Sequence, residues 1–206
     1  MTQIASKRKS TRRINGSTVQ GLNVPSIEIC ILAGGLSKRM GRDKSRLRLG
    51  RTTMLGHIRK TACATGLAVR VIRRDCVPKC GPLGGIYTAL KTTRADAVLF
   101  LACDMPLVTT ELIEFVLRRV QRISGNWKPS IHVALFVRTR GRVGFPLVLA
   151  RESVESVRQQ IEKREFSLQS LAKALTATIL PLKGPWSRLL FNINTPREWA
   201  IVRHRQ

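Results

Sequence analysis

A glycine-rich, basic segment follows the first apolar run of the chain. Glycines let successive backbone amides approach an anion closely, and four lysine or arginine side chains carry positive charge to the same place. Triphosphate binding is the chemistry that this combination favours. The spacing matches neither the P-loop nor the dinucleotide-binding pattern. The segment reads Leu32-Ala33-Gly34-Gly35-Leu36-Ser37-Lys38-Arg39-Met40-Gly41-Arg42-Asp43-Lys44.

The elements around this segment alternate between short apolar runs and helical patterns. Strands that are apolar throughout belong to a sheet covered on both faces, so we predict an α/β fold with a single doubly wound, mostly parallel sheet in three layers. In such a sheet ligands bind at the carboxyl ends of the strands, which is where the glycine-rich segment begins. The expected strands are Ile27–Leu32, Leu67–Ile72 and Ala97–Ala102, and the expected helices are Thr53–Thr65, Gly84–Lys91 and Glu111–Arg122.

The second half of the chain is less regular. Val133–Val137 and Phe145–Leu149 flank the turn-rich Thr139–Gly144 and predict a short antiparallel insertion. Helices are expected at Glu152–Lys163 and Leu168–Leu175, and a strand at Leu189–Ile193. The run Thr195-Pro196-Arg197-Glu198 is a capping box, which predicts that a helix begins there.

Taken together, four motifs resemble those of the molybdenum cofactor guanylyltransferase family, which makes molybdopterin guanine dinucleotide on a Rossmann-like nucleotidyltransferase domain. The glycine-rich segment and the Asp-Met-Pro segment are specific in combination, and the resemblance runs from about Ile27 to the carboxyl end. The three motifs after the first are Gly81-Pro82-Leu83-Gly84-Gly85, Leu101-Ala102-Cys103-Asp104-Met105-Pro106-Leu107 and Phe191-Asn192-Ile193-Asn194-Thr195-Pro196.

The resemblance implies a role for each matching residue. Asp104 ends a buried strand, where a carboxylate is costly unless it meets a cation, and it is the expected Mg²⁺ ligand. Lys44, Arg39 and Asp104 are the expected catalytic residues, and Asn192 and Asn194 the expected acceptor-binding residues. The expected nucleotide-binding residues are Leu32, Ala33, Gly34, Gly35, Arg39, Lys44, Asp75, Gly81, Pro82 and Leu83.

The implied reaction transfers GMP from Mg-GTP to the phosphate of molybdenum-molybdopterin and releases pyrophosphate. Between Gly50 and Gly81 the chain has room for one helix and one strand, where the family usually has two strands. Base specificity and catalytic competence are therefore open. One alternative is a cytidylyltransferase, or another NTP transferase, that acts on a related phosphorylated acceptor. Another is a protein that binds polyanions or nucleic acid on an inactive nucleotidyltransferase scaffold.

Composition limits the remaining possibilities. The chain has 206 residues with 37 Lys and Arg against 12 Asp and Glu, a net charge of +25 that attracts polyanions without specifying one. No apolar run approaches the ~18 residues of a membrane span. We expect a flexible basic extension over residues 1–25, one nucleotidyltransferase domain over 26–206 and a cytoplasmic location. The five cysteines form no Cys-x-x-Cys pair, and the sequence does not indicate an oligomeric state.

Overall fold

The computed structural model describes residues 25–34, 47–124, 133–193 and 195–203. Its main sheet has six strands in the order β4-β1-β5-β7-β6-β8. The two pairings that involve β7 are antiparallel, and the other three are parallel. The predicted mostly parallel α/β sheet is confirmed, and its antiparallel element lies inside the main sheet. The strands are β1 (Ile27–Leu32), β4 (Ala68–Ile72), β5 (Ala97–Ala102), β6 (Ala134–Thr139), β7 (Arg142–Ala150) and β8 (Thr178–Pro181).

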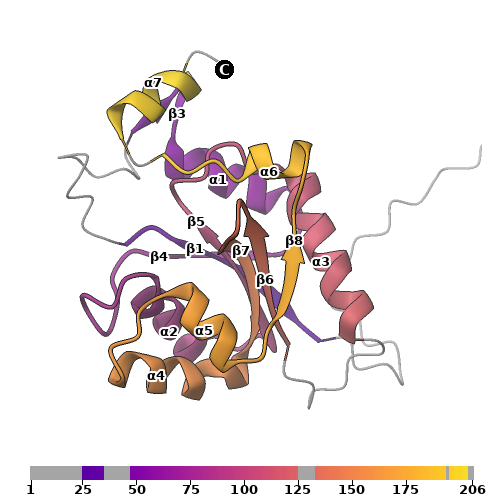
Figure 1. Ribbon diagram of the computed structural model, residues 1–206. Coiled ribbons are helices and arrows are strands. Elements are labelled where there is room, and N and C mark those ends of the chain that lie inside the picture. The colour runs from indigo at the N-terminus through magenta and orange to yellow at the C-terminus, as the bar shows by residue number, and fades with distance from the viewer. Residues whose placement is uncertain (1–24, 35–46, 125–132, 194, 204–206) are drawn as a thin grey trace, which may run out of the picture.

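Helices cover both faces of this sheet (Figure 1). Alternate residues of β1 face opposite layers: Ile29 and Ile31 belong to one buried cluster and Cys30 to the other, all three with no exposed surface. This two-sided burial is why the strand is apolar from Ile29 to Leu32, whereas Glu28, near its start, is partly buried and ion-paired with Arg70 at 2.7 Å. On one face lie α1 (Met54–Cys63), α3 (Thr110–Ser124) and α6 (Pro185–Leu189), and on the other α2 (Pro82–Thr92), α4 (Val154–Glu162) and α5 (Leu168–Ala174).

Local capping explains where the first helices begin. The backbone amide of Gly56 donates a hydrogen bond of 3.0 Å to the Thr53 hydroxyl, which caps α1 one residue after the predicted start. Helix α2 begins two residues before its predicted start because Pro82 occupies the first helical position, where a missing N–H has no cost. The bounds expected for β1 and β5 are confirmed.

The turn predicted over Thr139–Gly144 is much shorter than expected. Strands β6 and β7 are joined by the two residues Arg140 and Gly141, with Thr139 and Arg142 paired directly across the hairpin. Both turn residues have positive φ, 48° and 77°, as a tight type I′ hairpin turn requires. Because Gly141 adopts this conformation without strain, the residues that follow it extend β7 instead of forming a loop.

The predicted strand Leu189–Ile193 was wrong. Gly184, with φ of 58°, ends an extended segment, and Pro185 begins helix α6, which continues to Leu189. The strand of this region is β8, which lies earlier and pairs in parallel with β6. Ile193 donates its backbone N–H to the carbonyl of Asp104 at 2.8 Å, and this contact joins two loops instead of two strands.

The carboxyl end of the described chain is held by the predicted capping box, which is confirmed. The Glu198 amide donates to the Thr195 hydroxyl at 3.2 Å, and the Thr195 amide donates to the Glu198 carboxylate at 2.8 Å. Helix α7 (Pro196–Arg203) begins here, near the short antiparallel pair β2 (Arg48–Leu49) and β3 (Thr52–Thr53) (Figure 1). No helix in the described ranges is long and apolar enough to cross a membrane.

Candidate active site

Three strand ends meet at one edge of the sheet, and the predicted site residues follow them. The amide of Ala33 donates to the carbonyl of Ile72 at 2.8 Å, which joins the ends of β1 and β4. The amide of Cys103 donates to the carbonyl of Leu32 at 3.1 Å, which joins β5 to β1 on the other side. Gly34, Asp75 and Asp104 therefore leave the sheet at the same edge, because the three strands are parallel.

Asp75 is packed against glycines from two different motifs. A Cβ atom added at Gly84 would lie 2.9 Å from Oδ2 of Asp75 and 2.7 Å from the carbonyl oxygen of Val77. A Cβ at Gly34 or Gly85 would lie 3.4 or 3.3 Å from Oδ1 of Asp75. The carboxylate thus sits between the glycine-rich segment and the first turn of α2, and larger residues at these positions would displace it.

The environment of Asp75 suits a hydrogen-bond acceptor for a ligand. Its side chain is partly buried, and desolvation raises the pKa of this carboxyl above 3.8. No hydrogen bond or positive charge within the described ranges offsets that desolvation. A ligand that donates N–H or O–H groups would stabilise the ionised form here.

The Gly-Pro-Leu motif presents backbone more than side chains. Gly81 has φ of 56° and precedes Pro82, the first residue of α2. The Leu83 side chain has no exposed surface and belongs to the core of the α2 face. Any contact that Leu83 makes with a ligand must therefore come from its backbone.

Asp104 lies beside the carboxyl-terminal motif. It follows β5 by two residues, its Oδ1 atom is buried, and its carbonyl accepts the 2.8 Å hydrogen bond from Ile193. Asn192, immediately before Ile193, is exposed. This hydrogen bond joins two motifs that are far apart in the sequence, the one that contains Asp104 and the predicted acceptor-binding segment.

A small buried hydrophobic cluster holds the segment that contains Asn192 and Ile193. It consists of Leu49, Met54 and Ile193, with Leu107 and Trp199 packed against it. The β2–β3 pair, the start of α1, the loop after Asp104 and α7 all contribute to it. The position of the Asn192 backbone therefore depends on four elements at once.

Several predicted residues have no description in the structure. Gly35, Arg39, Lys44 and Asn194 lie outside the described residues. The structure brings together Gly34 with Asp75, and Asp104 with the segment that carries Asn192. The packing of Gly84 and Gly85 on Asp75 was missed by sequence reasoning, although both glycines belong to a motif already recognised.

The available donors fit magnesium bound largely by a substrate. Within the described ranges no three His, Cys, Asp or Glu side chains form a cluster able to hold a metal. Magnesium in nucleotide sites usually takes one or two carboxylates and completes its shell with phosphate oxygens and water. A single protein carboxylate, that of Asp104, fits this pattern. It does not fit a metal site in which the protein supplies every ligand.

A separate cavity of about 550 Å³ opens on the α1–α3 side. None of the predicted site residues lines it, so it lies beside the candidate site. A hydrogen bond from the Thr109 side chain lowers the pKa of Glu111, which lines this cavity together with Arg188. The lining consists of His57, Thr61, Pro106, Leu107, Val108, Thr109, Thr110, Glu111, Arg188 and Leu189.

The chain matches a known protein family over most of its length. The model of the MobA-like NTP transferase domain matches residues 29–178, from β1 to the first residue of β8. The chain belongs to this family.

Relatives of this MobA-like chain extend over most of its length. The molybdenum cofactor guanylyltransferase of Acinetobacter baumannii is 30% identical over 175 residues, covering 75% of this chain and 81% of the relative. The probable molybdenum cofactor guanylyltransferase of Carboxydothermus hydrogenoformans is 27% identical over 196 residues, covering 84% and 93%.

Solved structures agree on the fold of this MobA-like domain. Molybdopterin-guanine dinucleotide biosynthesis protein A from Archaeoglobus fulgidus superposes with a TM-score of 0.68 at 17% identity, covering 86% of this chain and 97% of the other. The 2-C-methyl-D-erythritol 4-phosphate cytidylyltransferase from Thermus thermophilus gives 0.61 at 13% identity, covering 87% and 98%. At these identities the likeness shows the nucleotidyltransferase fold alone.

Proposed function

We propose that this MobA-like NTP transferase moves GMP from GTP to the phosphate of molybdenum-molybdopterin. The convergence of Gly34, Asp75 and Asp104 at the carboxyl ends of three parallel strands carries the proposal, and the names of the relatives support it. A phosphate oxygen of the acceptor attacks the α-phosphorus of GTP. The bond from that phosphorus to the oxygen shared with the β-phosphate breaks, and pyrophosphate leaves.

The triphosphate would be held by the glycine-rich segment. Phosphoryl chemistry of this kind needs placement and neutralisation of developing negative charge more than covalent help from the protein. The backbone from Gly34 onward would bind phosphate oxygens, while Arg39 and Lys44 would offset the charge on the departing pyrophosphate. A magnesium ion held by Asp104 would add positive charge to the same phosphates.

Asp75 would select the base. The hydrogen-bonding edge of guanine carries two neighbouring N–H donors, and a carboxylate accepts both at once. Adenine and cytosine present a donor beside an acceptor on the same edge, and that acceptor would face a negative oxygen. The partly buried position of Asp75 between Gly34 and Gly84 makes this discrimination stronger than it would be in water.

The acceptor would bind on the opposite side of the phosphates, at the carboxyl-terminal motif. Asn192 is exposed beside Asp104, and an amide side chain both donates and accepts hydrogen bonds. Asn194 would act in the same way.

Nucleotide and acceptor specificity can be measured together. The full chain is supplied with Mg²⁺ and GTP, CTP or ATP, each with and without molybdopterin, and pyrophosphate release and product mass are followed. Release with GTP that depends on molybdopterin, together with the dinucleotide product, supports the proposal. Preference for CTP would favour the cytidylyltransferase alternative, and no release with any nucleotide would refute the enzymatic function.

One pair of variants isolates the role of Asp104. Asp104 and Asp96 stand at opposite ends of β5, and Asp96 only holds Ser26 through two hydrogen bonds of 2.8 Å. Asp104→Asn should lower turnover by about 10²-fold or more, the usual loss when a group that stabilises transition-state charge is removed. Asp96→Asn should retain turnover, and equal losses in both variants would show that Asp104 acts only through the fold.

Lys44→Ala should abolish turnover while the protein still unfolds cooperatively.

A further inference from the structure

A group of basic side chains lies at the end of the β6–β7 hairpin. Arg138 is near the end of β6, Arg140 is in the turn, and Arg142 begins β7. Lys183 joins them from a distant part of the sequence, because Arg138 is paired with Pro181 and accepts a 2.9 Å hydrogen bond from the Leu182 amide. We call these four residues the hairpin-end surface.

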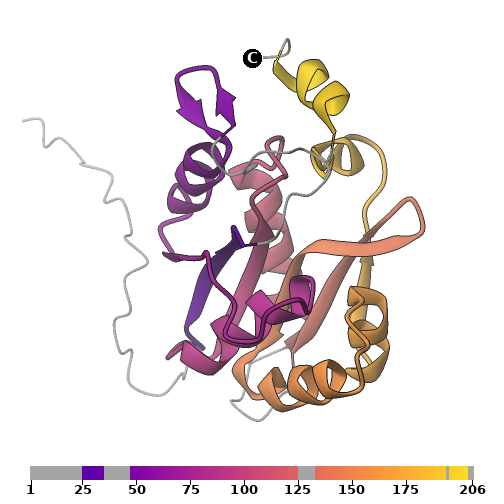
Figure 2. The same cartoon turned by 90° about the vertical axis from the view of Figure 1, so that its left-hand side faces the viewer.

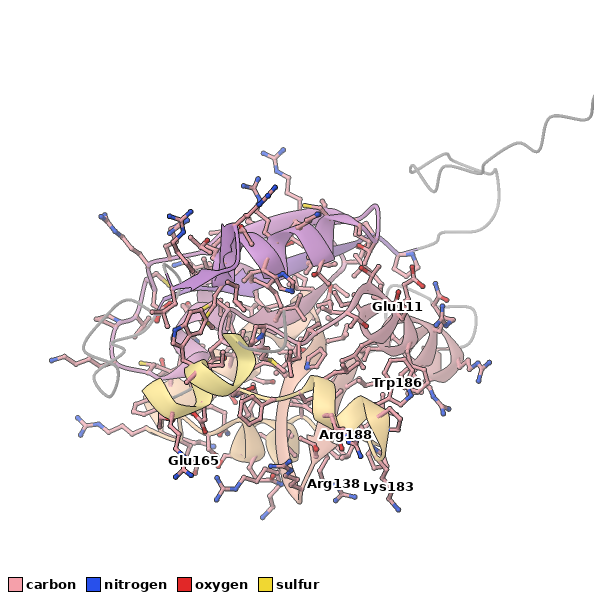
Figure 3. All side chains as sticks on the ribbon, turned by 90° about the horizontal axis from the view of Figure 1, so that it is seen from above. Glu111, Arg138, Glu165, Lys183, Trp186 and Arg188 are labelled. Atoms are coloured by element: carbon pink, nitrogen blue, oxygen red, sulfur yellow. The ribbon has the colours of Figure 1, made fainter. Side chains whose placement is uncertain are left out.

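The hairpin-end surface is exposed and carries positive charge without compensation. All four side chains are exposed, and none makes an ion pair within the described ranges. No Asp or Glu occurs anywhere in residues 133–151 or 166–197, the two segments that build this surface. Arg138 and Lys183 lie on one side of the molecule in Figure 3, with Arg188 near them, and the hairpin reaches the edge of the molecule in Figure 2.

The spacing of the charges follows from the sheet. Arg142 lies on β7 and Arg138 on the neighbouring strand β6. Lys183 follows β8, which is the next strand of the sheet. Neighbouring strands are about 4.8 Å apart, so the three positions span about 10 Å. Arg138 and its partner Val143 share one face of the hairpin, whereas Arg142 and its partner Thr139 share the other. A linear polyanion that crosses the end of the hairpin can therefore contact cations on both faces.

The position of Arg140 indicates that its charge matters more than its fit to the turn. Its φ of 48° is costly for a residue with a long side chain, and Asn, Asp or Gly is the usual occupant of this place in a hairpin turn. An arginine kept in an unfavourable backbone conformation suggests a use for the guanidinium.

The surroundings favour phosphates over a protein partner. A typical protein interface has an apolar centre, yet the one large hydrophobic side chain exposed within the described ranges, Ile123, lies near the far end of α3. Three of the four cations are arginines, whose planar fork matches phosphate oxygens. The net charge of +25 would also attract a long polyanion more strongly than a small ligand.

We propose that the hairpin-end surface binds the phosphodiester backbone of nucleic acid without sequence preference. This surface lies at the same edge of the sheet as the candidate active site, because β6 runs parallel to β5, but two strands further along. The binding is independent of the transferase reaction.

Two triple variants with the same change of charge test the proposal. Arg138, Arg142 and Lys183 are replaced by Ser in one, and in the other Arg94, Arg122 and Arg151, which are also exposed but lie at the opposite edge of the sheet. Binding of a fluorescent 20-nucleotide oligouridylate is measured against salt concentration. Each lost phosphate contact reduces the slope of log affinity against log salt by about 0.7 for a single strand, so the first variant should lose about 2 units of slope and the control little.

Arg140→Asn separates the charge from the backbone. Asn suits the turn, so the melting temperature should stay the same or rise while the salt slope falls by about 0.7. Equal losses in both triple variants would show an effect of net charge alone and overturn the proposal, as would no loss in either. Displacement of the oligonucleotide by saturating Mg-GTP would place it in the nucleotide site and also overturn it. The proposal would also be overturned if the protein bound anionic lipid vesicles through the same three cations and did not bind the oligonucleotide.

Discussion

At the scale of single residues, Asp75 occupies a place that is better for binding than for stability. Its carboxylate is partly buried between Gly34 and Gly84, and desolvation raises its pKa. An acceptor that is poorly satisfied in the free protein gains most when a ligand supplies donors. Removing its charge should therefore have opposite effects on folding and on catalysis.

Asp75→Asn should raise the melting temperature at pH 7 and lower kcat/KM for GTP. The folded-state pKa lies above the ordinary 3.8, so the ionised carboxylate destabilises the fold above the folded-state pKa, and this effect disappears as pH falls below 3.8. The gain in melting temperature should shrink between about pH 7 and pH 4. Asp96→Asn controls for the change in net charge, and a gain in the Asp75 variant that does not change with pH would contradict this account.

Gly84→Ala should destabilise the protein by about 1–2 kcal/mol, because the new methyl group would lie 2.7 Å from the Val77 carbonyl. The gain in helix propensity from Ala is smaller, at most about 1 kcal/mol. Gly144→Ala is the matched control, since nothing lies within 4 Å of its added Cβ. Urea unfolding of both variants gives the comparison, and equal stabilities would show that the first turn of α2 moves at no cost.

At the scale of elements, α7 is held to the domain through its amino end. The capping box at Thr195 and Glu198 begins the helix, and Trp199 packs on the cluster that contains Ile193. Ile193 in turn holds the Asp104 loop. The helix therefore supports the proposed acceptor segment, although it is far from the glycine-rich segment in the sequence.

Thr195→Ala should loosen α7 without unfolding the domain. Loss of an N-cap costs about 1 kcal/mol, which corresponds to about fivefold faster amide hydrogen exchange in a helix that opens locally. The effect is expected in residues 196–203, with a higher KM for the acceptor and little change in KM for GTP. Thr53→Ala removes the same kind of cap from α1, and its effect should stay in α1. If exchange in α7 responds equally to both variants, the capping box does not hold the helix.

At the scale of the whole molecule, the net charge of +25 destabilises the folded state. Among the described residues the ion pairs are few, and those of Arg158 with Glu155 and Glu162 are exposed and contribute little. Like charges spread over a surface repel one another and destabilise the compact state.

Salt should therefore stabilise this protein. From about 0.01 M to 0.1 M sodium chloride the screening length falls from about 30 to about 10 Å. We expect the melting temperature to rise by about 2–4 °C, equivalent to about 1 kcal/mol for a chain of this size. The same change should weaken oligonucleotide binding. A melting temperature that falls with salt would show that attractive charge pairs dominate.

The sequence by itself determined the strands β1 and β5, because two-sided burial demands the continuous apolar runs Ile29–Leu32 and Ala97–Ala102. It also determined the capping box, because Thr195 and Glu198 act within one helical turn. The family resemblance followed from residue types at short spacing, and the match of the family model over residues 29–178 confirms the family.

Only the tertiary structure decided which distant residues meet. The packing of Asp75 on Gly34 and Gly84, the bond from Ile193 to Asp104 and the approach of Lys183 to Arg138 all join separate segments. Local propensity carries no information about such contacts, since they arise when strands pair and layers pack. The failed strand at Leu189–Ile193 has the same cause: its apolar residues are buried by α6 and loops, and burial alone does not specify a strand.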